Sequence, residues 1–316
     1  MDQELLYEKD GIRAYQKSFP GTDVREFSAT GFVDAPMEVL GEVIVDVPRY
    51  PNWMADVSEA RVVQDIDRHT KVIYCRLKLP WPISDRDFVI RNQTVIDLET
   101  ARCIINFAAV DDRSVAPAKK CVRMTDLTGS YKLEYLGADK TLVTFTQKAH
   151  PGGNTPPAMA NVQSQHYPYK DIKGLRRMVR EKVYWERGRV SEDRKIIEEA
   201  LSDPNRAVLV MKNRFLEYAG DKKVVDKLFA SDPEIAAAIT GRELTYDAIR
   251  TQVARSIEKL FEMGAADKVI KDAALRKRLK SDKALLNRML KDDKLTFSLL
   301  ENKQGLEKTL ADYLAA

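Results

Sequence analysis

The sequence predicts an α+β protein, with a largely antiparallel sheet in the first half of the chain and an all-α module in the second. Two observations predict this division. Up to about residue 150, short runs of alternating apolar and polar residues are separated by turns, which is typical of strands with one covered face. Beyond Gly188, proline and glycine become rare and apolar residues recur at helical spacing. We therefore expect one domain over residues 1–187 and another over residues 190–316.

The length and the net charge of the chain limit the classes of function that it can have. The chain has 316 residues, 44% hydrophobic and 32% charged, which suits about two domains of ~100–200 residues, each with its own core. The 52 basic and 48 acidic side chains leave a net charge of +4, which excludes a strongly polybasic nucleic-acid-binding protein. We expect no nucleic-acid partner.

One segment shows the strand pattern most clearly. Between Val72 and Leu79, an apolar residue at every second position alternates with Tyr74, Arg76 and Lys78. Similar patterns extend over Tyr7–Lys17, Val24–Val33, Ala60–Gln64, Phe88–Leu98, Arg102–Val110, Cys121–Leu136 and Thr141–His150. Short turns separate several of these segments, so the sheet of about eight strands is expected to be mainly antiparallel.

Two helices interrupt or close this sheet. Residues 35–45 predict a short helix, and the segment from about Pro156 to Arg187 predicts a long one after a turn rich in proline and glycine. The long helix carries an apolar stripe at intervals of 3, 4 and 4 residues, formed by Ile172, Leu175, Val179 and Val183. Gly174 inside it is expected to be a flexible point.

The second half reads as amphipathic helices. Pro204–Tyr218 and Thr245–Met263 each carry one apolar face and stop at a glycine, Gly220 and Gly264. Near the C-terminus, Leu275, Leu286 and Phe297 are 11 residues apart, and Asp282 and Asp293 are expected to be N-caps of successive short helices.

The start of the chain and its cysteines predict a cytoplasmic protein. The first ten residues carry four acids where a signal peptide would be basic and then apolar, and no run of about 18 apolar residues occurs. The three cysteines, odd in number and far apart, are expected to be free and buried. An exported protein whose signal peptide has been removed would have the same sequence features, and this alternative stays open.

Several motifs, in one order and spacing, carry a family resemblance. They are Tyr7-Glu-Lys-Asp-Gly-Ile-Arg-Ala-Tyr15, Pro80-Trp-Pro-Ile-Ser-Asp-Arg-Asp-Phe88, Val122-Arg-Met124 leading to Gly129-Ser-Tyr131, and Pro151-Gly-Gly-Asn-Thr-Pro156 before a long helix. Together, over about residues 1–187, they resemble the START domain, the steroidogenic-acute-regulatory-related lipid transfer family. Residues 190–316 are not recognised.

The resemblance implies a helix-grip fold: a curved antiparallel sheet wrapped around a long C-terminal helix, with an internal hydrophobic tunnel that shields one lipid. It also implies a carrier or sensor rather than an enzyme. We expect no cofactor and no metal. Our first hypothesis is a soluble carrier or sensor of one lipid-like molecule, such as a sterol, a hopanoid, a fatty acyl lipid or a phospholipid.

Three apolar faces are the candidate tunnel walls. They are expected to contribute Ile73, Cys75 and Leu77 from one strand, Cys103, Ile105 and Phe107 from another, and Ile172, Leu175 and Val179 from the long helix. Because side chains alternate along a strand, a slip of one residue would turn the opposite face inward.

Arg86 has two interpretations. It is expected either to tie down the loop between two strands through carboxylates and backbone carbonyls, or, as the resemblance implies, to face the phosphate of a bound lipid. Leu79 stands where phosphatidylcholine-binding relatives carry an aromatic residue, which argues against a choline lipid. Trp53 and Trp81 are interpreted as anchors of the core and of the loop.

The long helix also predicts contact with a membrane. Residues 170–189 carry eight basic side chains against three acidic ones. We expect Lys173, Arg176, Arg177 and Arg180 to meet anionic headgroups transiently. The alternative is an ordinary solvated helix face.

Catalytic motifs are weak. His69, His150 and His166 are scattered, without the spacing of a zinc site, and His150 is expected to hydrogen-bond the following turn rather than act as a general base. Two further hypotheses stay open. One is a helix-grip enzyme, such as a cyclase or hydrolase, which would need a convergent acid/base pair in the tunnel. The other is a ligand-responsive interaction protein that binds a partner, or itself, through residues 190–316.

Overall fold

The computed structural model describes residues 3–81, 83–231, 245–301 and 305–315. They form two compact units. The sheet unit is built from Met1–Asp97, Arg102–Tyr135 and Thr141–Ser191. The helical unit is built from Glu192–Ala316 together with the short segments Leu98–Ala101 and Leu136–Lys140.

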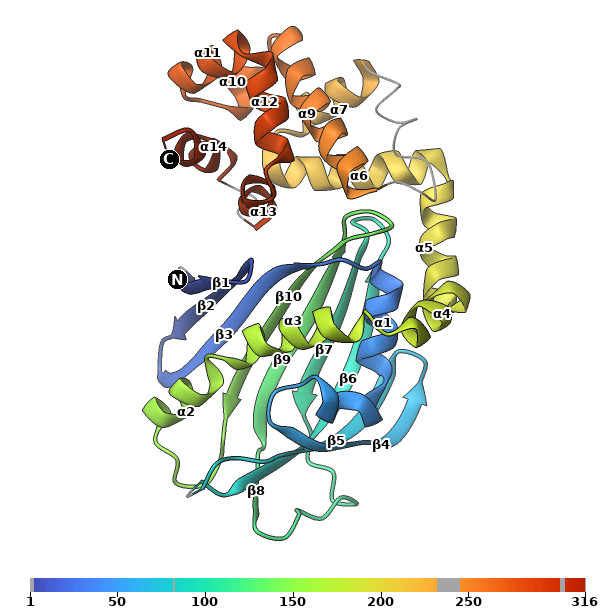
Figure 1. Ribbon diagram of the computed structural model, residues 1–316, viewed down its shortest axis with the longest axis vertical. Coiled ribbons are helices and arrows are strands. Elements are labelled where there is room, and N and C mark those ends of the chain that lie inside the picture. Colours follow the sequence, from blue (N-terminus) through green and yellow to red (C-terminus); the bar gives the residue numbers. More distant parts are fainter. Residues whose placement is uncertain (1–2, 82, 232–244, 302–304, 316) are drawn as a thin grey trace. The chain divides into compact units, whose positions relative to one another are not determined.

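The sheet unit contains one sheet of ten strands (Figure 1). The strands are β1 (Glu4–Lys9), β2 (Ile12–Phe19), β3 (Thr22–Val33), β4 (Val57–Asp67), β5 (Thr70–Leu77), β6 (Asp85–Asp97), β7 (Arg102–Ala109), β8 (Cys121–Arg123), β9 (Asp126–Tyr135) and β10 (Thr141–His150). Their order is β1-β2-β3-β10-β9-β7-β6-β5-β4, and every neighbouring pair on this path is antiparallel. The short β8 pairs with β6 in parallel.

Two predicted strands are each divided in the structure. Tyr7–Lys17 spans a hairpin, because Asp10 and Gly11 both adopt left-handed φ angles of 54° and 62° and turn the chain between β1 and β2. Asp-Gly is a favoured pair for such a two-residue turn. The segment Cys121–Leu136 contains β8 and β9.

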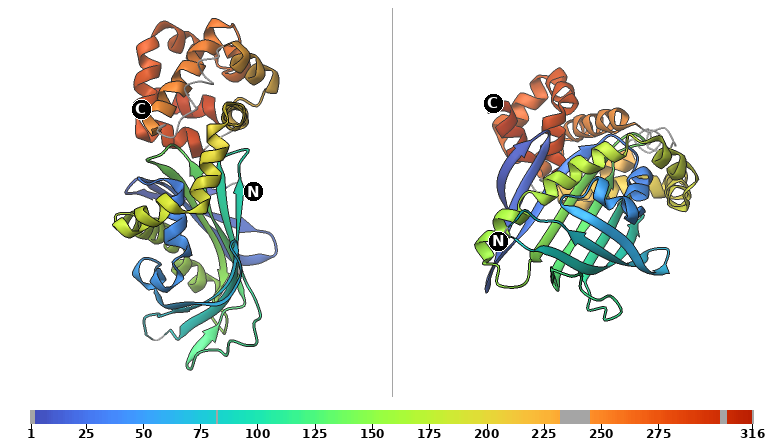
Figure 2. Two further views of the ribbon diagram at one scale, coloured as in Figure 1. Left: turned by 90° about the vertical axis from the view of Figure 1, so that its right-hand side faces the viewer. Right: turned by 60° about the horizontal axis from the view of Figure 1, so that its bottom comes forward.

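Helices cover one face of the sheet (Figure 2). They are α1 (Met37–Val45), the 3-10 helix η1 (Val47–Asn52), α2 (Pro157–Ser164), α3 (Tyr167–Met178) and α4 (Lys182–Val190). The covered face is visible in β10, where Val143, Phe145 and Ala149 are buried and alternate with partly exposed residues. The predicted α+β class is thus confirmed.

The single helix predicted over 156–187 is wrong in detail, because it is three helices. Pro168 lies in the first turn of α3, where it cannot continue a preceding helix without losing a backbone hydrogen bond. Glu181 has an extended conformation before α4 begins. The chain therefore bends on both sides of α3, the segment that crosses the sheet.

A close approach fixes where α3 lies. Gly174 is buried, and a Cβ atom built on it would fall well inside van der Waals contact with the carbonyl oxygen of Trp53, the residue after η1. The absent side chain, rather than backbone flexibility, is what this position requires. The expectation of a flexible point at Gly174 is replaced by a packing role.

The helical unit consists of short helices. They are α5 (Glu192–Ser202), α6 (Pro204–Ala219), α7 (Lys222–Ser231), α9 (Tyr246–Glu262), α10 (Ala266–Val269), α11 (Ala273–Ser281), α12 (Lys283–Lys291), α13 (Asp293–Glu301) and α14 (Leu306–Ala315). Leucine and methionine side chains from α11 to α13 share one buried cluster with α9.

A repeat of ten residues, not eleven, organises α11 to α13. Asp272, Asp282 and Asp292 each accept a hydrogen bond from the backbone N–H three residues later, at 2.7, 2.8 and 3.3 Å. Each therefore caps the helix that follows it. The prediction of a cap at Asp282 is confirmed, but Asp293 lies inside α13 and its neighbour Asp292 is the cap.

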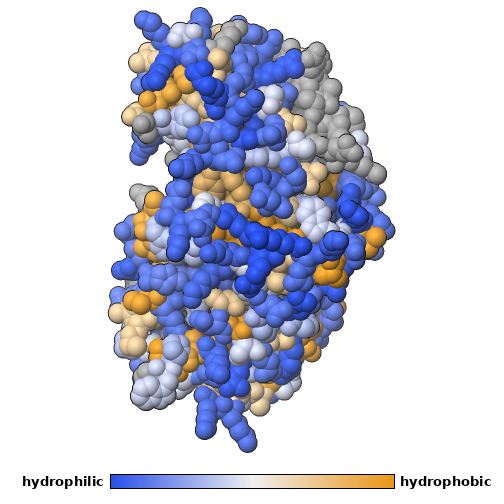
Figure 3. Space-filling view, viewed as in Figure 1, coloured by the Kyte–Doolittle hydropathy of each residue, from blue (hydrophilic) through white to orange (hydrophobic). Residues whose placement is uncertain are grey.

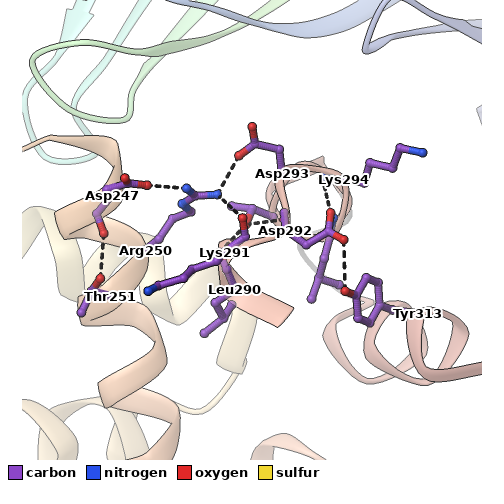
Figure 4. Close-up of polar contacts among 11 residues, drawn as sticks. Asp247, Arg250, Thr251, Leu290, Lys291, Asp292, Asp293, Lys294 and Tyr313 are labelled. Atoms are coloured by element: carbon purple, nitrogen blue, oxygen red, sulfur yellow. Dashed lines mark hydrogen bonds and ion pairs between the residues drawn. The ribbon is translucent and has the colours of Figure 1, made fainter. Parts of the chain in front are cut away.

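Arg250 and Asp292 join helices of this unit (Figure 4). Arg250 on α9 donates to the Lys291 carbonyl at 2.9 Å and to Asp293 at 2.6 Å, and it also pairs with Asp247. Asp292 accepts from the Tyr313 hydroxyl of α14 at 3.0 Å. These bonds hold the junction between α12 and α13 against two neighbouring helices.

We expect Gly174→Ala to destabilise the sheet unit by roughly 2–4 kcal/mol, because α3 must move away from Trp53 to make room. The measurement is denaturant unfolding followed by tryptophan fluorescence, which reports on this unit since all three tryptophans, the third being Trp185, lie in it. Gly41→Ala is the matched control: its Cβ meets nothing within 4 Å in α1, and it should stabilise by about 0.5–1 kcal/mol. Equal effects at the two glycines would contradict the packing role.

Candidate functional site

An apolar cavity lies between α3 and the covered face of the sheet. It measures about 80 Å³ and is lined by residues of η1, α2, α3 and strands β4, β5, β6, β7, β9 and β10. Its wall is mainly apolar, and its polar members include Tyr50, Arg86, Asn92, Tyr131 and Asp171. A mostly apolar cavity with a few polar groups is the usual form of a small-molecule site.

The structure places the predicted strand residues unequally. Cys75 and Leu77 on β5 and Phe107 on β7 line the cavity, whereas Ile73 does not. Cys103 and Ile105 do not line the cavity either. They precede Phe107 on β7, closer to the start of the strand. Burial raises the pKa of the Cys75 thiol well above its ordinary range, so this cysteine acts as an apolar wall residue.

On α3 the cavity side is not the predicted stripe. Ile172, Leu175 and Val179 are buried, but Asp171 is the α3 residue beside Tyr167 that lines the cavity. Consecutive residues of a helix point about 100° apart. Asp171 therefore lines the cavity while the next residue, Ile172, packs in the core. The missed signal is the spacing of Ser164, Tyr167 and Asp171, at intervals of 3 and 4 residues on one side of the helical segment.

Asp171 is the central polar group of the cavity. It is 3% exposed, and its carboxyl oxygens accept hydrogen bonds from the Ala55 backbone N–H at 3.0 Å and from the Tyr131 hydroxyl at 3.2 Å. Burial raises the pKa of this carboxyl to about 7, although both hydrogen bonds favour the ionised form. The group is therefore close to half ionised near neutral pH.

Aromatic rings hold Tyr131 in place. Its ring stacks on Phe145 with 4.3 Å between centroids, and Phe107 and Trp53 lie at 6.3 Å. Burial and the neighbouring Asp171 raise the pKa of its hydroxyl well above the ordinary value, so Tyr131 stays a hydrogen-bond donor. The Asp171 carboxyl thus faces a rigid, aromatic wall.

Arg86 connects the loop before β6 with the segment that leads to α2. Its Nε donates to the Pro151 carbonyl at 2.7 Å, its Nη2 to the Thr155 hydroxyl at 2.8 Å, and its Nη1 to the Ser84 carbonyl. Two of these partners are backbone carbonyls, as the structural interpretation expects, and the third is a hydroxyl where that interpretation expects carboxylates. Because Arg86 also lines the cavity, its role toward a ligand stays a prediction.

Comparison with known proteins now identifies the fold. A sequence profile of the START domain matches residues 4–183. The chain belongs to the START family. The predicted resemblance and helix-grip class are thereby confirmed for the sheet unit, hereafter the START domain.

Several known proteins are similar to part of this chain. The phosphatidylcholine transfer protein of Homo sapiens is 25% identical over 163 residues, 51% of this chain and 75% of that protein. An uncharacterized protein of Pseudomonas aeruginosa is 26% identical over 177 residues, 55% of this chain and 85% of that protein. The crystal structure of a STAR-related lipid transfer protein from Xanthomonas axonopodis has a TM-score of 0.53 at 26% identity, covering 57% of this chain and 99% of that one.

Arg176 on α3 is occupied within the START domain. Its guanidinium donates to the backbone carbonyls of Phe32 at 2.7 Å, Asp10 at 2.6 Å and Gly11 at 3.3 Å. These bonds tie α3 to the turn between β1 and β2. Arg176 therefore has a structural role in holding α3 in place.

The other basic residues predicted to contact membranes differ in exposure and pairing. Lys173 forms an ion pair with Asp10 at 3.0 Å, and Arg177 donates to the Asn52 carbonyl. Arg180 is exposed two residues after the end of α3. Membrane contact by these side chains stays a prediction.

Exposed apolar side chains occur on two elements beside the cavity. Trp81, in the loop between β5 and β6, is 93% exposed, so its interpretation as a loop anchor is wrong, whereas Trp53 is buried. On α2, Met159 and Val162 are 52% and 65% exposed, while other α2 residues line the cavity. Large exposed apolar groups of this kind often mark contact surfaces.

His150 has the structural role expected for it, because its Nδ1 accepts the Gly152 backbone N–H at 3.1 Å. Within the described ranges, no group of three or more histidine, cysteine or acidic side chains is placed to hold a metal ion. None of the described helices is long and apolar enough to cross a bilayer.

The raised pKa of Asp171 predicts a pH-dependent stability. Because the folded-state pKa, about 7, exceeds the ordinary 3.8, this carboxyl stabilises the fold fully below about pH 4 and loses that contribution as pH rises through 7. Relative to Asp171→Asn, the parent should therefore lose up to about 4 kcal/mol between pH 4 and 8. Tryptophan-monitored unfolding across this range measures it, with the exposed Asp126→Asn as the control. Parallel curves for parent and Asp171→Asn would disprove the assignment.

Proposed function

We propose that the protein carries or senses one lipid-like molecule, held in the START domain cavity. The observation that supports this most directly is the apolar cavity under α3, with polar groups confined to a few positions. Apolar surface removed from water contributes about 25 cal/mol per Å², so a few hundred Å² suffice for micromolar binding after association costs. The names of two relatives, a phosphatidylcholine transfer protein and a STAR-related lipid transfer protein, agree with this class of ligand.

Loading requires the cavity to open. Its wall is formed by η1, α2, α3 and the sheet, and we propose that part of this wall moves outward to admit a lipid. We assign this motion to α2, which is separated from α3 by a bend at residues 165–166. The side chain of Asn161 latches α2 to the sheet, donating to the Asp23 carbonyl at 2.9 Å and accepting from the Arg25 N–H at 3.0 Å.

A carrier must also meet the membrane that supplies its lipid. Trp81, Met159 and Val162 are exposed on the loop and helix that border the cavity. Figure 3 shows apolar surface over α2 on a face that is otherwise mostly hydrophilic. We propose that these side chains enter the headgroup region while α2 opens.

A second candidate is an enzyme acting on a hydrophobic substrate, and one observation favours it. Asp171 and Tyr131 form a hydrogen-bonded acid/base pair inside the cavity, and the carboxyl has a near-neutral pKa. The two functions separate by the fate of the ligand. A carrier returns the bound molecule with unchanged mass after prolonged incubation, whereas an enzyme returns a product whose formation stops in Asp171→Asn.

Organic extraction and native mass spectrometry of the full chain test the carrier proposal. We expect one lipid-like molecule per chain, either co-purified or taken up from vesicles. Ala149→Trp, which fills the cavity, should lower occupancy about tenfold or more, since overpacking costs roughly 1–3 kcal/mol. Ala108→Trp on the exposed side of β7 is the control and should leave occupancy unchanged. A parent protein that neither contains nor acquires a hydrophobic molecule would refute the proposal.

Lipid transfer between vesicles tests the membrane contact. Trp81→Ser should slow transfer about tenfold, because inserting a large apolar side chain contributes roughly 1.5–3 kcal/mol, and Val162→Ser should act in the same direction. Val190→Ser on α4, exposed but away from the cavity wall, is the control. Transfer by Trp81→Ser at the parent rate would exclude this surface from the docking step.

A further inference from the structure

One part of the cavity wall carries a hydrogen-bond acceptor that has no donor. Asn92 on β6 lines the cavity, and its Oδ1 is buried without a hydrogen-bond partner among the described residues. Other polar groups of the same wall include Tyr50, Tyr131 and Asp171, which come from η1, β9 and α3. A buried acceptor without a donor is costly in a folded protein, so it points to a missing partner.

The orientation of the Asn92 amide follows from its neighbour. The Tyr50 hydroxyl uses its proton to donate to the Ile44 carbonyl at 2.8 Å, and the Asn92 side chain is its other hydrogen-bond partner. Tyr50 can therefore only accept from Asn92, which directs the amide N–H₂ of Asn92 to Tyr50. The carbonyl oxygen of Asn92 is left for another donor.

The second acceptor is the Asp171 carboxyl. Its two oxygens accept one hydrogen bond each from Ala55 and Tyr131, and in the ionised form the carboxylate has room for about four. Tyr131 lies within electrostatic range of both Asp171 and Tyr50, and Tyr50 is hydrogen-bonded to Asn92, so the two tyrosines connect the two acceptors in one polar cluster. An anionic ligand group would face a carboxylate here, and an ammonium would pay the larger desolvation cost of a full charge.

We propose that the buried end of the ligand is a hydroxyl group that donates to Asn92 Oδ1, in the cavity that the Asp171 carboxyl also lines. The inference rests on the carrier function proposed above and narrows its ligand to a lipid alcohol. Linear alcohols and sterols share this group. The aromatic rings of Phe107, Tyr131 and Phe145 form the wall against which the apolar body next to the hydroxyl packs.

Competition between an alcohol and its methyl ether measures the contribution of the hydroxyl proton to binding, because the ether lacks that hydrogen-bond donor. The full chain is offered equal amounts of 1-hexadecanol and 1-methoxyhexadecane, and a second arm offers cholesterol and cholesterol methyl ether, with occupancy read by native mass spectrometry. The alcohol should be preferred about tenfold in at least one arm, as expected for one hydrogen bond to a buried acceptor. The arm that shows the preference distinguishes linear from sterol ligands.

Variants assign the preference to the two acceptors. Asn92→Leu should reduce the alcohol-to-ether ratio to within about twofold of one while the ether still binds, whereas Asn106→Leu, the same change on the exposed side of β7, should keep it. At pH 8, hexadecanoic acid should compete poorly with the parent and about tenfold better with Asp171→Asn, which lacks the like charge.

Equal binding of alcohol and ether by the parent in both arms, or an unchanged ratio in Asn92→Leu, would overturn the inference but leave the carrier function intact. Binding of none of the probes would overturn both.

Discussion

The contact of α3 with the residue after η1 is the constraint on which the rest of the START domain depends. Only a glycine at position 174 lets the helix backbone reach the Trp53 carbonyl. This approach brings Asp171, three residues earlier, within hydrogen-bond distance of Ala55 and places it over Tyr131. The same helix then closes the cavity. The close contact between α3 and Trp53 therefore determines both the packing of the helix and the position of the polar group in the cavity.

Periodicity was enough to predict the class of fold and the order of its two halves, because alternation and helical spacing are local properties. It also predicted that Cys75 and Leu77 share a face. It did not predict the hairpin at Asp10 and Gly11, which interrupts alternation by only two residues. Nor did it locate the bends around α3, since the apolar stripe continues through them.

The candidate site was harder to predict than the fold, for a physical reason. An aspartate in a basic helix looks solvated, and only its spacing from Ser164 and Tyr167 connects Asp171 with the cavity side of the helical segment. Its burial depends on Ala55 and Tyr131, residues far apart in the chain. Asn92 is similar, because its free oxygen is defined only by what Tyr50 does with its own proton. Arg86 was recognisable by its motif, but its three partners were not.

The ten-residue repeat of the helical unit has a consequence for how this part of the chain can change. Each unit begins with a capping aspartate and places a leucine three residues later and a leucine or methionine seven residues later: Asp272, Leu275 and Leu279; Asp282, Leu285 and Met289; Asp292, Leu295 and Leu299. Because cap and apolar positions recur in register, inserting or deleting ten residues at a cap leaves the pattern of every other unit unchanged. The length of this region can thus change by whole helices.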